Sequence, residues 1–443
     1  MKPNIIFIMV DQMHHRAVSA YGNPHVSTPN LDRMIQEGTS FMKMHTIMPM
    51  CCPARASWMT GRTSKEHGIV MNDCPINPEF PDLAQWFRKH SDYETVYTGK
   101  WHIPNRLPED SFDKVLIHEK VRVGEMLDAP VARSSVAYLQ NKKDDKPFFL
   151  CISFLNPHDC CFTGGAAGGL GKFELSDTMK DRLPPLPKGF RFAKNPYIQS
   201  RTKGWDRTDW RYYIYSYYRM VEAVDAEIGM VCDAVRNSRF ADNTLVIFTS
   251  DHGDGLAFHG NLSKGILEDE AWRVPAVVCG KDVPSGVLDE EHLASGLDIP
   301  ATICDYAGLP PLPKANLAKS WRPVLEGRAE KWREYVVGET PHPYRGIAFR
   351  DNQETKTIFY NDGTVDVYDM GRDPQEFHNL SGTPRGEEIV KRHRGYLADY
   401  LSKITLSPKP TLGPLRKDEE KMHWYDYIEW YEQLREDLAH EPA

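Results

Sequence analysis

The stretch from Met50 to Arg62 combines a cysteine, a proline and an arginine at a spacing that favours chemistry on an anion. Pro53 suits the first turn of a helix, which would place Cys51 near the positive end of the helix dipole. Arg55 follows Cys51 by four residues, so its guanidinium would lie one turn along the same helix face. A thiol beside a guanidinium at a helix start is suited to anionic chemistry.

Other interpretations of the cysteines are possible. A tyrosine-phosphatase loop requires five residues between cysteine and arginine, whereas three separate Cys51 from Arg55. A zinc site would need spaced cysteine pairs, but Cys51-Cys52 and Cys160-Cys161 are adjacent doublets. The nine cysteines do not form a disulfide framework, which favours a reduced compartment. Simple packing in a hydrophobic core is a further interpretation for five of the cysteines, namely Cys52, Cys151, Cys232, Cys279 and Cys304.

Several apolar runs without alternation predict strands that are buried on both faces. These runs are Asn4–Val10, Thr95–Thr98, Pro147–Leu155, Thr244–Thr249 and Val274–Cys279. In open α/β sheets, sites form at the carboxyl ends of strands, and four of these runs are followed by polar residues. Those residues are Asp11-Gln12, then Lys100 and His102, then Asn156-Pro157-His158, and finally Asp251-His252-Gly253-Asp254.

Helical patterns lie between the predicted strands. Thr28-Pro29 predicts a helix start and Gly38 its end, while apolar residues at helical spacing predict a second helix over about 209–237. Strands that alternate with helices indicate an α/β sandwich around a mainly parallel sheet.

The pattern changes after about residue 330. Shorter strands are expected at 346–350, 355–360 and 364–368, with a hairpin turn at Asn361-Asp362-Gly363 and a helix over 389–401. We therefore expect a large α/β domain over 1–330 and a smaller C-terminal α+β subdomain with an antiparallel sheet over 331–443. Its aromatic tail, with Trp424, Tyr425, Tyr427, Trp430 and Tyr431, is expected to act as a strap over the main domain.

The composition is that of an ordinary globular protein of 443 residues, with 41% hydrophobic and 26% charged residues. A net charge of −8 gives no indication of a nucleic-acid partner. No apolar run approaches the roughly 18 residues of a membrane helix, so no membrane association is expected. The sequence shows no secretory signal and predicts a cytoplasmic protein, or a periplasmic or secreted one if a leader is removed.

The ordered motifs of the chain resemble those of the type I sulfatases, in the alkaline-phosphatase-like superfamily. Cys51-x-Pro53-x-Arg55 followed by Thr60-Gly61-Arg62 is similar to the family signature. The further matching segments are Pro3–Ile6 with Asp11, Ser27–Asp32, Thr98–His102, Asn156–His158, Thr249–Gly253 with His259-Gly260, Lys264, Arg273–Pro275, Val367–Asp369 and Asp373–Leu380.

The resemblance implies a sandwich with a large mainly parallel sheet flanked by helices, and hydrolysis of a sulfate ester to an alcohol and inorganic sulfate. A maturation enzyme would oxidise Cys51 to formylglycine, whose hydrate is the nucleophile; only Cys51 has the required proline and arginine. The resemblance gives the metal ligands as Asp11, Gln12, Asp251, His252 and an oxygen of modified Cys51.

The resemblance also assigns roles around the sulfate group. Arg55 would hold the hydrate, and Lys100, His158 and Lys264 would surround the sulfate oxygens. His102 would be the base that collapses the sulfated intermediate, and His158 the acid for the leaving alcohol. Lys142, in contrast, is expected to be a surface lysine.

Two departures from the family pattern allow other metals and a second function. Gln12 and His252 stand where many members have Asp and Asn, which keeps Ca²⁺ as first choice but makes Mn²⁺ or Zn²⁺ possible. The same variant occurs in relatives that hydrolyse phosphonate monoesters and phosphodiesters, which is the alternative function. A non-catalytic binding protein on this fold is a further alternative. A sulfated carbohydrate or an aryl sulfate is the expected substrate.

Overall fold

A computed structural model describes residues 2–118, 123–163, 175–193, 196–340, 345–408 and 425–440. Its internal contacts divide the chain into two compact units. Unit 1 comprises Met1–Met42, Ser91–Trp101 and Phe112–Asp289, and unit 2 comprises Lys43–His90, His102–Ser111 and Glu290–Ala443. The division into domains 1–330 and 331–443 stays a prediction.

An eight-stranded sheet has the strand order β4-β3-β5-β1-β6-β7-β2-β8. The five neighbouring strands β4, β3, β5, β1 and β6 run parallel to one another, whereas β7 runs antiparallel to both β6 and β2. The strands are β1 (Asn4–Asp11), β2 (Gly38–His45), β3 (Glu94–Gly99), β4 (Lys114–His118), β5 (Phe148–Pro157), β6 (Thr244–Ser250), β7 (Ala276–Gly280) and β8 (Val287–Ser295). The predicted α/β class with a mainly parallel sheet is confirmed.

Strand β1 lies between two parallel neighbours, β5 and β6. All eight of its residues are buried, as expected for a β-branched and aromatic run between two parallel neighbours. Ile6 pairs with Leu150 of β5 and with Val246 of β6. Because these three strands run in the same direction, the residues that follow them meet at one edge of the sheet.

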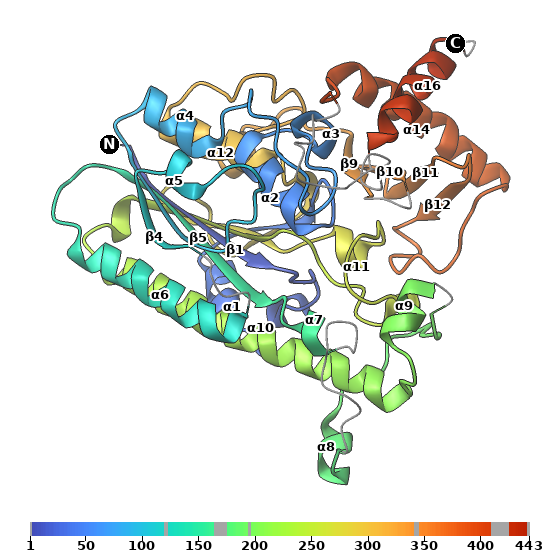
Figure 1. Ribbon diagram of the computed structural model, residues 1–443, viewed down its shortest axis with the longest axis horizontal. Coiled ribbons are helices and arrows are strands. Elements are labelled where there is room, and N and C mark those ends of the chain that lie inside the picture. The colour runs from blue at the N-terminus through green and yellow to red at the C-terminus, as the bar shows by residue number, and fades with distance from the viewer. Residues whose placement is uncertain are drawn as a thin grey trace, which may run out of the picture. The chain divides into compact units, whose positions relative to one another are not determined.

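Helices α1, α6 and α10 pack on one face of this part of the sheet, and α6 and α10 lie side by side (Figure 1). Their apolar faces join the strands in one core. Asp206 caps α10 through the backbone N–H groups of Thr208 and Asp209. The helices of unit 1 are α1 (Pro29–Gln36), α6 (Gly124–Asn141), α7 (Cys160–Thr163), α8 (Asp177–Arg182), α9 (Pro196–Arg201), α10 (Arg207–Arg236) and α11 (Asp269–Trp272), with short 3₁₀ turns at Ser19–Tyr21, Ala241–Asn243 and Phe258–Gly260.

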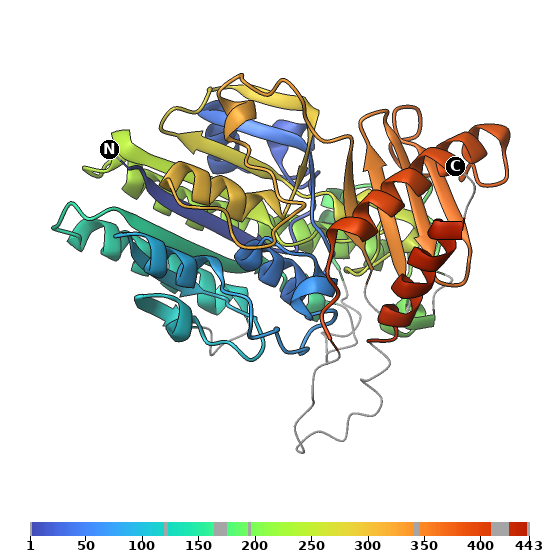
Figure 2. The same cartoon turned by 90° about the horizontal axis from the view of Figure 1, so that it is seen from above.

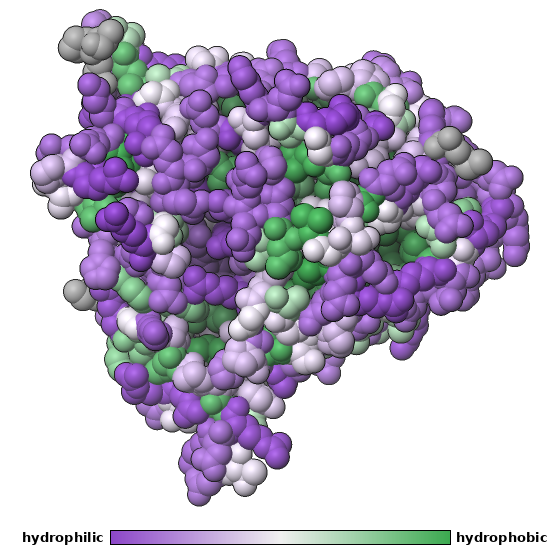
Figure 3. All heavy atoms as spheres, turned by 180° about the vertical axis from the view of Figure 1, so that it is seen from behind, coloured by the Kyte–Doolittle hydropathy of each residue, from purple (hydrophilic) through white to green (hydrophobic). Residues whose placement is uncertain are grey.

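Helix α8 differs from the other helices of unit 1 because none of its residues is buried. Figure 3 shows it as a hydrophilic projection at the lower end of the view. Ser176 caps its start by accepting a hydrogen bond from the Met179 N–H. Helix α8 therefore contributes nothing to the core.

Unit 2 contains a four-stranded antiparallel sheet in the order β12-β11-β10-β9, and α14 packs across it (Figure 2). The strands are β9 (Tyr335–Glu339), β10 (Gly346–Asp351), β11 (Thr355–Tyr360) and β12 (Val365–Asp369). The predicted C-terminal strands and the hairpin between β11 and β12 are confirmed. The helices of unit 2 are α2 (Cys51–Thr60), α3 (Ser64–His67), α4 (Leu83–His90), α5 (Pro108–Ser111), α12 (Asp298–Ala307), α13 (Arg322–Leu325), α14 (Pro384–Lys403) and α16 (Tyr427–His440).

Helix α14 begins five residues before the predicted start at Ile389. The Thr383 hydroxyl accepts a hydrogen bond from the Gly386 N–H, and Pro384 occupies the first turn. A threonine cap followed by proline is a strong helix start, whereas the prediction began at the first buried apolar residue.

The described part of the aromatic tail lies within unit 2 and contacts both α3, in the predicted domain 1–330, and β9, in the predicted subdomain 331–443. Trp424 lies outside the described residues. Tyr425, Tyr427 and Tyr431 are buried. The Tyr431 hydroxyl donates to Glu339 Oε1 at 2.9 Å, and the ammonium of Lys65 lies 4.5 Å from the ring centre of Tyr427. These contacts attach the tail to the buried residues around α3.

The pH dependence of stability offers a test of this packing. Burial raises the pKa of Glu66 to about 7, although its carboxyl accepts backbone N–H groups of Thr63 and Thr405. A folded-state pKa above the unfolded value means that Glu66 stabilises the fold fully below about pH 4.5, and that this contribution is lost as the pH rises through about 7.

We therefore expect the Tm of the protein to fall between pH 5 and pH 8 by more than the Tm of Glu66→Gln. The amide of the variant still accepts a hydrogen bond but does not ionise. Thermal denaturation of both proteins at the two pH values measures the difference. Equal pH dependence of the two Tm values would show that Glu66 is ionised without cost in the folded state.

Candidate active site

The carboxyl ends of β1 and β6 bring together three possible metal ligands in unit 1. One ligand atom each from Asp11, Asp251 and His252 lies within 4.8 Å of the others, and all three side chains are fully buried. His252 Nε2 is 3.8 Å from Asp11 Oδ1 and 3.5 Å from Asp251 Oδ1. Two carboxylates and an imidazole nitrogen form a donor set that suits a divalent cation.

The backbone orients the imidazole of His252 for this role. Its Nδ1 lies 2.8 Å from the carbonyl oxygen of Gly253, so Nδ1 carries the proton and donates to that oxygen. The lone pair of Nε2 is then directed toward Asp11 and Asp251. A metal-ligating histidine typically has its other ring nitrogen fixed in this way. The local arrangement therefore fits a divalent metal.

Lys100 and Lys264 add positive charge around these acidic residues. The Lys100 ammonium donates to Asp11 Oδ2 at 2.6 Å, and both side chains are almost fully buried. The Lys264 ammonium donates to Gln12 Oε1 at 3.0 Å. Within unit 1, Lys100 thus binds Asp11, and Lys264 binds Gln12, the residue that follows Asp11. All four residues were predicted to belong to the site.

Asp254 was named among the polar residues at the end of a predicted strand, but no role in the site was predicted for it. It accepts a hydrogen bond from Gln12 Nε2 at 2.6 Å and another from the Tyr213 hydroxyl at 2.9 Å. The thiol of Cys161 donates to Gln12 Oε1 at 3.4 Å. Asp254 therefore fixes which end of the Gln12 amide points toward Lys264. Its place three residues after Asp251 was the available signal.

Cys51 and Arg55 lie on helix α2 in unit 2. As predicted, the helix begins at Cys51, Pro53 lies in its first turn, and both Cys51 and Arg55 are buried. The Arg55 guanidinium carbon lies 5.8 Å from the centre of the Trp58 ring, which holds the arginine on the helix. The local geometry is that expected for an activated residue at a helix N-terminus.

The two predicted proton carriers lie in different units. His102, in unit 2, has a positive φ of 57°, and its Nδ1 is buried without a hydrogen-bond partner among the described residues. His158, in unit 1, directly follows β5, where Pro157 pairs with Asp11 of β1. His158 is thus placed beside the acidic cluster by strand pairing.

Asp128 and Asp159 form a second arrangement that was not predicted, and it positions His158. Asp128 of α6 accepts the N–H groups of Leu155 and Asn156 at 2.6 and 2.9 Å. Asp159 in turn accepts the N–H of Gly124 at the start of α6. Burial raises the pKa of Asp128 to about 7. The one indication in the sequence was a carboxylate on the apolar face of a helix.

The expectation that Lys142 is a surface lysine was wrong. Its side chain is 2% exposed, and its ammonium pairs with Glu94 and Asp144. The side chain reaches Glu94 of β3, which is 12% exposed, so its removal would break a largely buried ion pair. Lys143, which is exposed, is the better control for substitutions in the site.

We expect Lys100→Ala to reduce kcat/KM for a sulfate ester by about a hundredfold or more, the usual cost of losing a charge contact made in the transition state. Lys143→Ala should leave kcat/KM unchanged. Steady-state kinetics of both variants, with melting curves to show that they are folded, measure the effect. Equal and small losses in two folded variants would show that Lys100 has no part in the reaction.

Among the described helices, none combines the length and apolar character required to cross a bilayer.

Comparison with known proteins places these residues in a family. Residues 3–309 match the family described as Sulfatase, and residues 257–403 match the C-terminal region of N-sulphoglucosamine sulphohydrolase. A Delta 4,5-hexuronate-2-O-sulfatase of Bacteroides thetaiotaomicron is 29% identical over 437 residues, which cover 91% of this chain and 89% of the relative.

Solved structures agree in fold. A 2-O GAG sulfatase superposes with a TM-score of 0.80 at 25% identity, covering 93% of this chain and 96% of the other. The phosphonate monoester hydrolase of Agrobacterium radiobacter has the same fold, with a TM-score of 0.72 at 22% identity and coverage of 90% and 95%. The match of the sulfatase family over more than half of the chain establishes that this protein belongs to the sulfatases and is a sulfatase enzyme.

Proposed function

We propose that this sulfatase removes a sulfate group from an anionic saccharide, with formylglycine derived from Cys51 as nucleophile. Two of the relatives support a saccharide substrate, since one is named for a hexuronate 2-O-sulfate and another for a GAG sulfate. The observation that carries the proposal is the buried cluster of Asp11, Asp251 and His252 with Lys100 at its side.

A divalent metal held by Asp11, Asp251 and His252, with help from Gln12, would act as a Lewis acid and stabilise negative charge on the sulfate oxygens. Formylglycine would supply a hydroxyl as nucleophile and a second hydroxyl whose proton is later removed. Ca²⁺ is the first choice. The imidazole of His252 makes Mn²⁺ or Zn²⁺ a reasonable second choice, because nitrogen ligands favour softer ions.

Five side chains of this protein would stabilise charge, transfer protons and hold the nucleophile. Lys100 and Lys264 would provide fixed positive charge for the sulfate oxygens, which develop negative charge in the transition state. His158 would donate a proton to the leaving alcohol, and His102 would remove the proton of the second hydroxyl. Arg55 would hold the formylglycine hydrate. A maturation enzyme would be needed to oxidise Cys51.

A phosphonate or phosphodiester hydrolase is the second candidate function, favoured by Gln12 and His252 and by the shared fold of the phosphonate monoester hydrolase. Parallel assays of the matured protein on an aryl sulfate and an aryl phosphonate separate the two candidates. We expect the higher kcat/KM on the sulfate. A higher kcat/KM on the phosphonate would favour the second candidate.

A further inference from the structure

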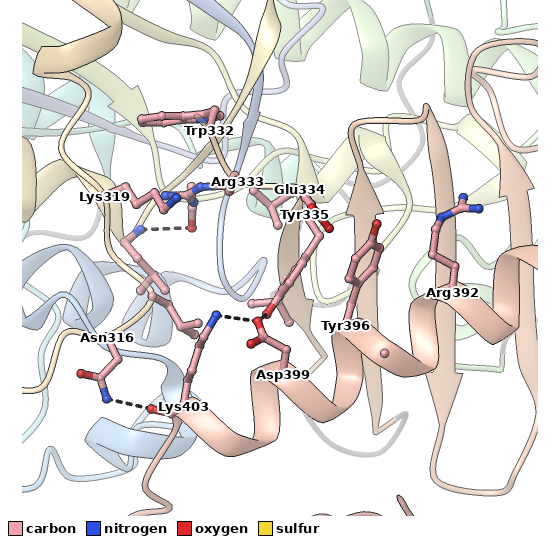
Figure 4. A pocket seen from close by; sticks show the side chains of 16 residues that line it. Asn316, Lys319, Trp332, Arg333, Glu334, Tyr335, Arg392, Tyr396, Asp399 and Lys403 are labelled. Carbon is pink, nitrogen blue, oxygen red and sulfur yellow. Dashed lines mark hydrogen bonds and ion pairs between the residues drawn. The ribbon is translucent and has the colours of Figure 1, made fainter. Parts of the chain in front are cut away.

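Unit 2 contains a cavity of about 520 Å³ whose lining includes none of the candidate active-site residues. Its volume is in the range of about 300–1,000 Å³ that is typical of small-ligand sites. One wall is formed by α14, where Arg392, Tyr396, Asp399 and Lys403 recur every three or four residues and so share a helix face (Figure 4). Tyr335 of β9 stacks on Tyr396 with a ring separation of 4.8 Å.

Most of the charged groups in the lining are paired. Arg333 pairs with the buried Asp298, and Arg392 donates to the buried Asp351. Lys403 donates to Asp399. These pairs fix the side chains in place and offset most of the charge.

Lys319 is different, because its ammonium has no hydrogen-bond partner among the described residues. It lies 5.7 Å from the centre of the Trp332 ring, and the guanidinium carbon of Arg333 lies 5.5 Å from the same ring (Figure 4). The pKa of Lys319 is lowered, first by partial burial and then by repulsion from Arg333. Two cations therefore lie beside one indole, and the carboxylate of Asp298, which pairs with Arg333, offsets only one of the two charges, so a further anion would offset the other.

Arg333 is the second cation of this corner of the cavity. Its side chain is 9% exposed, and its guanidinium is fixed by the ion pair with the buried Asp298. The indole of Trp332 is fixed by donating to the Leu293 carbonyl oxygen at 2.6 Å. Trp332 and Arg333 are thus fixed before any ligand arrives, which reduces the entropy that these two side chains lose on binding.

The other polar groups of the lining are acceptors suited to hydroxyl groups. Asp399 accepts from Tyr335 and Lys403, which leaves lone pairs unused on a carboxylate that has about four. Asn316 and Glu334 contribute further oxygens to the same lining. A simple inorganic anion would be repelled by Asp399 and Glu334, whereas a sugar that carries both hydroxyls and a sulfate would use both kinds of group.

We propose that this cavity is a binding site for a sulfated saccharide unit, separate from the catalytic residues. Lys319 and Arg333 bind the sulfate group, Asp399 and Asn316 accept hydrogen bonds from sugar hydroxyls, and the tyrosine rings contact the ring carbons. The choice of a sulfated sugar rests on the proposed function, but binding at this site does not depend on turnover.

Calorimetric titration tests this with the full chain carrying Cys51→Ala, which prevents turnover, and Lys100→Ala, which weakens anion binding at the catalytic residues. The probes are a sulfated glucosamine–uronate tetrasaccharide, its desulfated counterpart and inorganic sulfate. We expect the sulfated tetrasaccharide to bind this protein and Lys319→Glu to weaken that binding by at least about tenfold, since a hydrogen bond to a charged group is lost. Lys331→Glu, an exposed neighbour outside the lining, should leave it unchanged.

Loss of tetrasaccharide binding on Lys100→Ala alone, or equal binding by Lys319→Glu and Lys331→Glu, would overturn the proposal. Equal affinity for inorganic sulfate and the sulfated tetrasaccharide would overturn the saccharide assignment. Lys319→Gln provides a second variant, and melting curves show that each is folded. A separate assay measures turnover of an aryl sulfate by matured protein in which Cys51 and Lys100 are intact. Lys319→Glu should leave this turnover unchanged. Failure of the catalytic proposal would appear in this assay, and failure of the binding proposal in the titration.

Discussion

Replacing Cys51 by serine should reduce turnover of a sulfate ester by on the order of 10⁶-fold, the typical cost of removing a catalytic nucleophile. A serine hydroxyl can accept the sulfuryl group, but it has no second hydroxyl whose deprotonation would expel sulfate. The variant should therefore stop after one transfer, leaving a sulfated serine. Steady-state assays and the mass of the peptide containing position 51 measure both effects.

Cys52→Ala is the matched control for this experiment. Cys52 is the next residue of α2 and is equally buried, and it contacts Asn72 through its backbone N–H, which the substitution keeps. The variant should retain most of its activity and lose only the packing of one sulfur. If both variants lose activity equally, the loss reflects damage to α2 rather than loss of the nucleophile.

Removal of divalent metal should abolish activity almost completely. Asp11 and Asp251 are both fully buried, and their carboxylates lie within a few ångströms of each other; Lys100 offsets only one of the two charges, so a further cation is needed. Exhaustive chelation followed by separate addition of Ca²⁺, Mn²⁺ and Zn²⁺ identifies the ion. Asp251→Asn should weaken metal binding, whereas the exposed Asp282→Asn should not. Full activity in a fully demetallated sample would contradict the metal assignment.

The sheet was predictable where the sequence carries long apolar runs. Strands β1, β5 and β6 are buried on both faces, so their composition alone identified them and located the polar residues at their ends. Strand β2 contains Thr, Ser and Lys, and β8 contains consecutive acidic residues; neither has a clear strand pattern. Helix α6 was missed because a glycine begins it and Pro130 lies inside it.

Two acidic residues of the site could be predicted from the same apolar runs. Asp11 and Asp251 directly follow apolar strands, so their proximity could be inferred from parallel pairing. The roles of Asp128 and Asp254 depend on contacts with residues 27 to 242 positions away in sequence, so no local sequence pattern predicts them. The charged groups around Lys319 come from the segment before β9 and from α12 and α14, and the sequence offers no sign that these parts of the chain enclose a cavity.

The most direct test of the catalytic account is the mass of the peptide containing Cys51, determined together with the turnover of an aryl sulfate by the same sample. Protein produced with a maturation enzyme should contain formylglycine at position 51, seen as loss of H₂S and gain of one oxygen, and an intact thiol at position 52. Activity should rise in proportion to the modified fraction. Full activity in a sample whose Cys51 thiol is entirely intact would contradict the account.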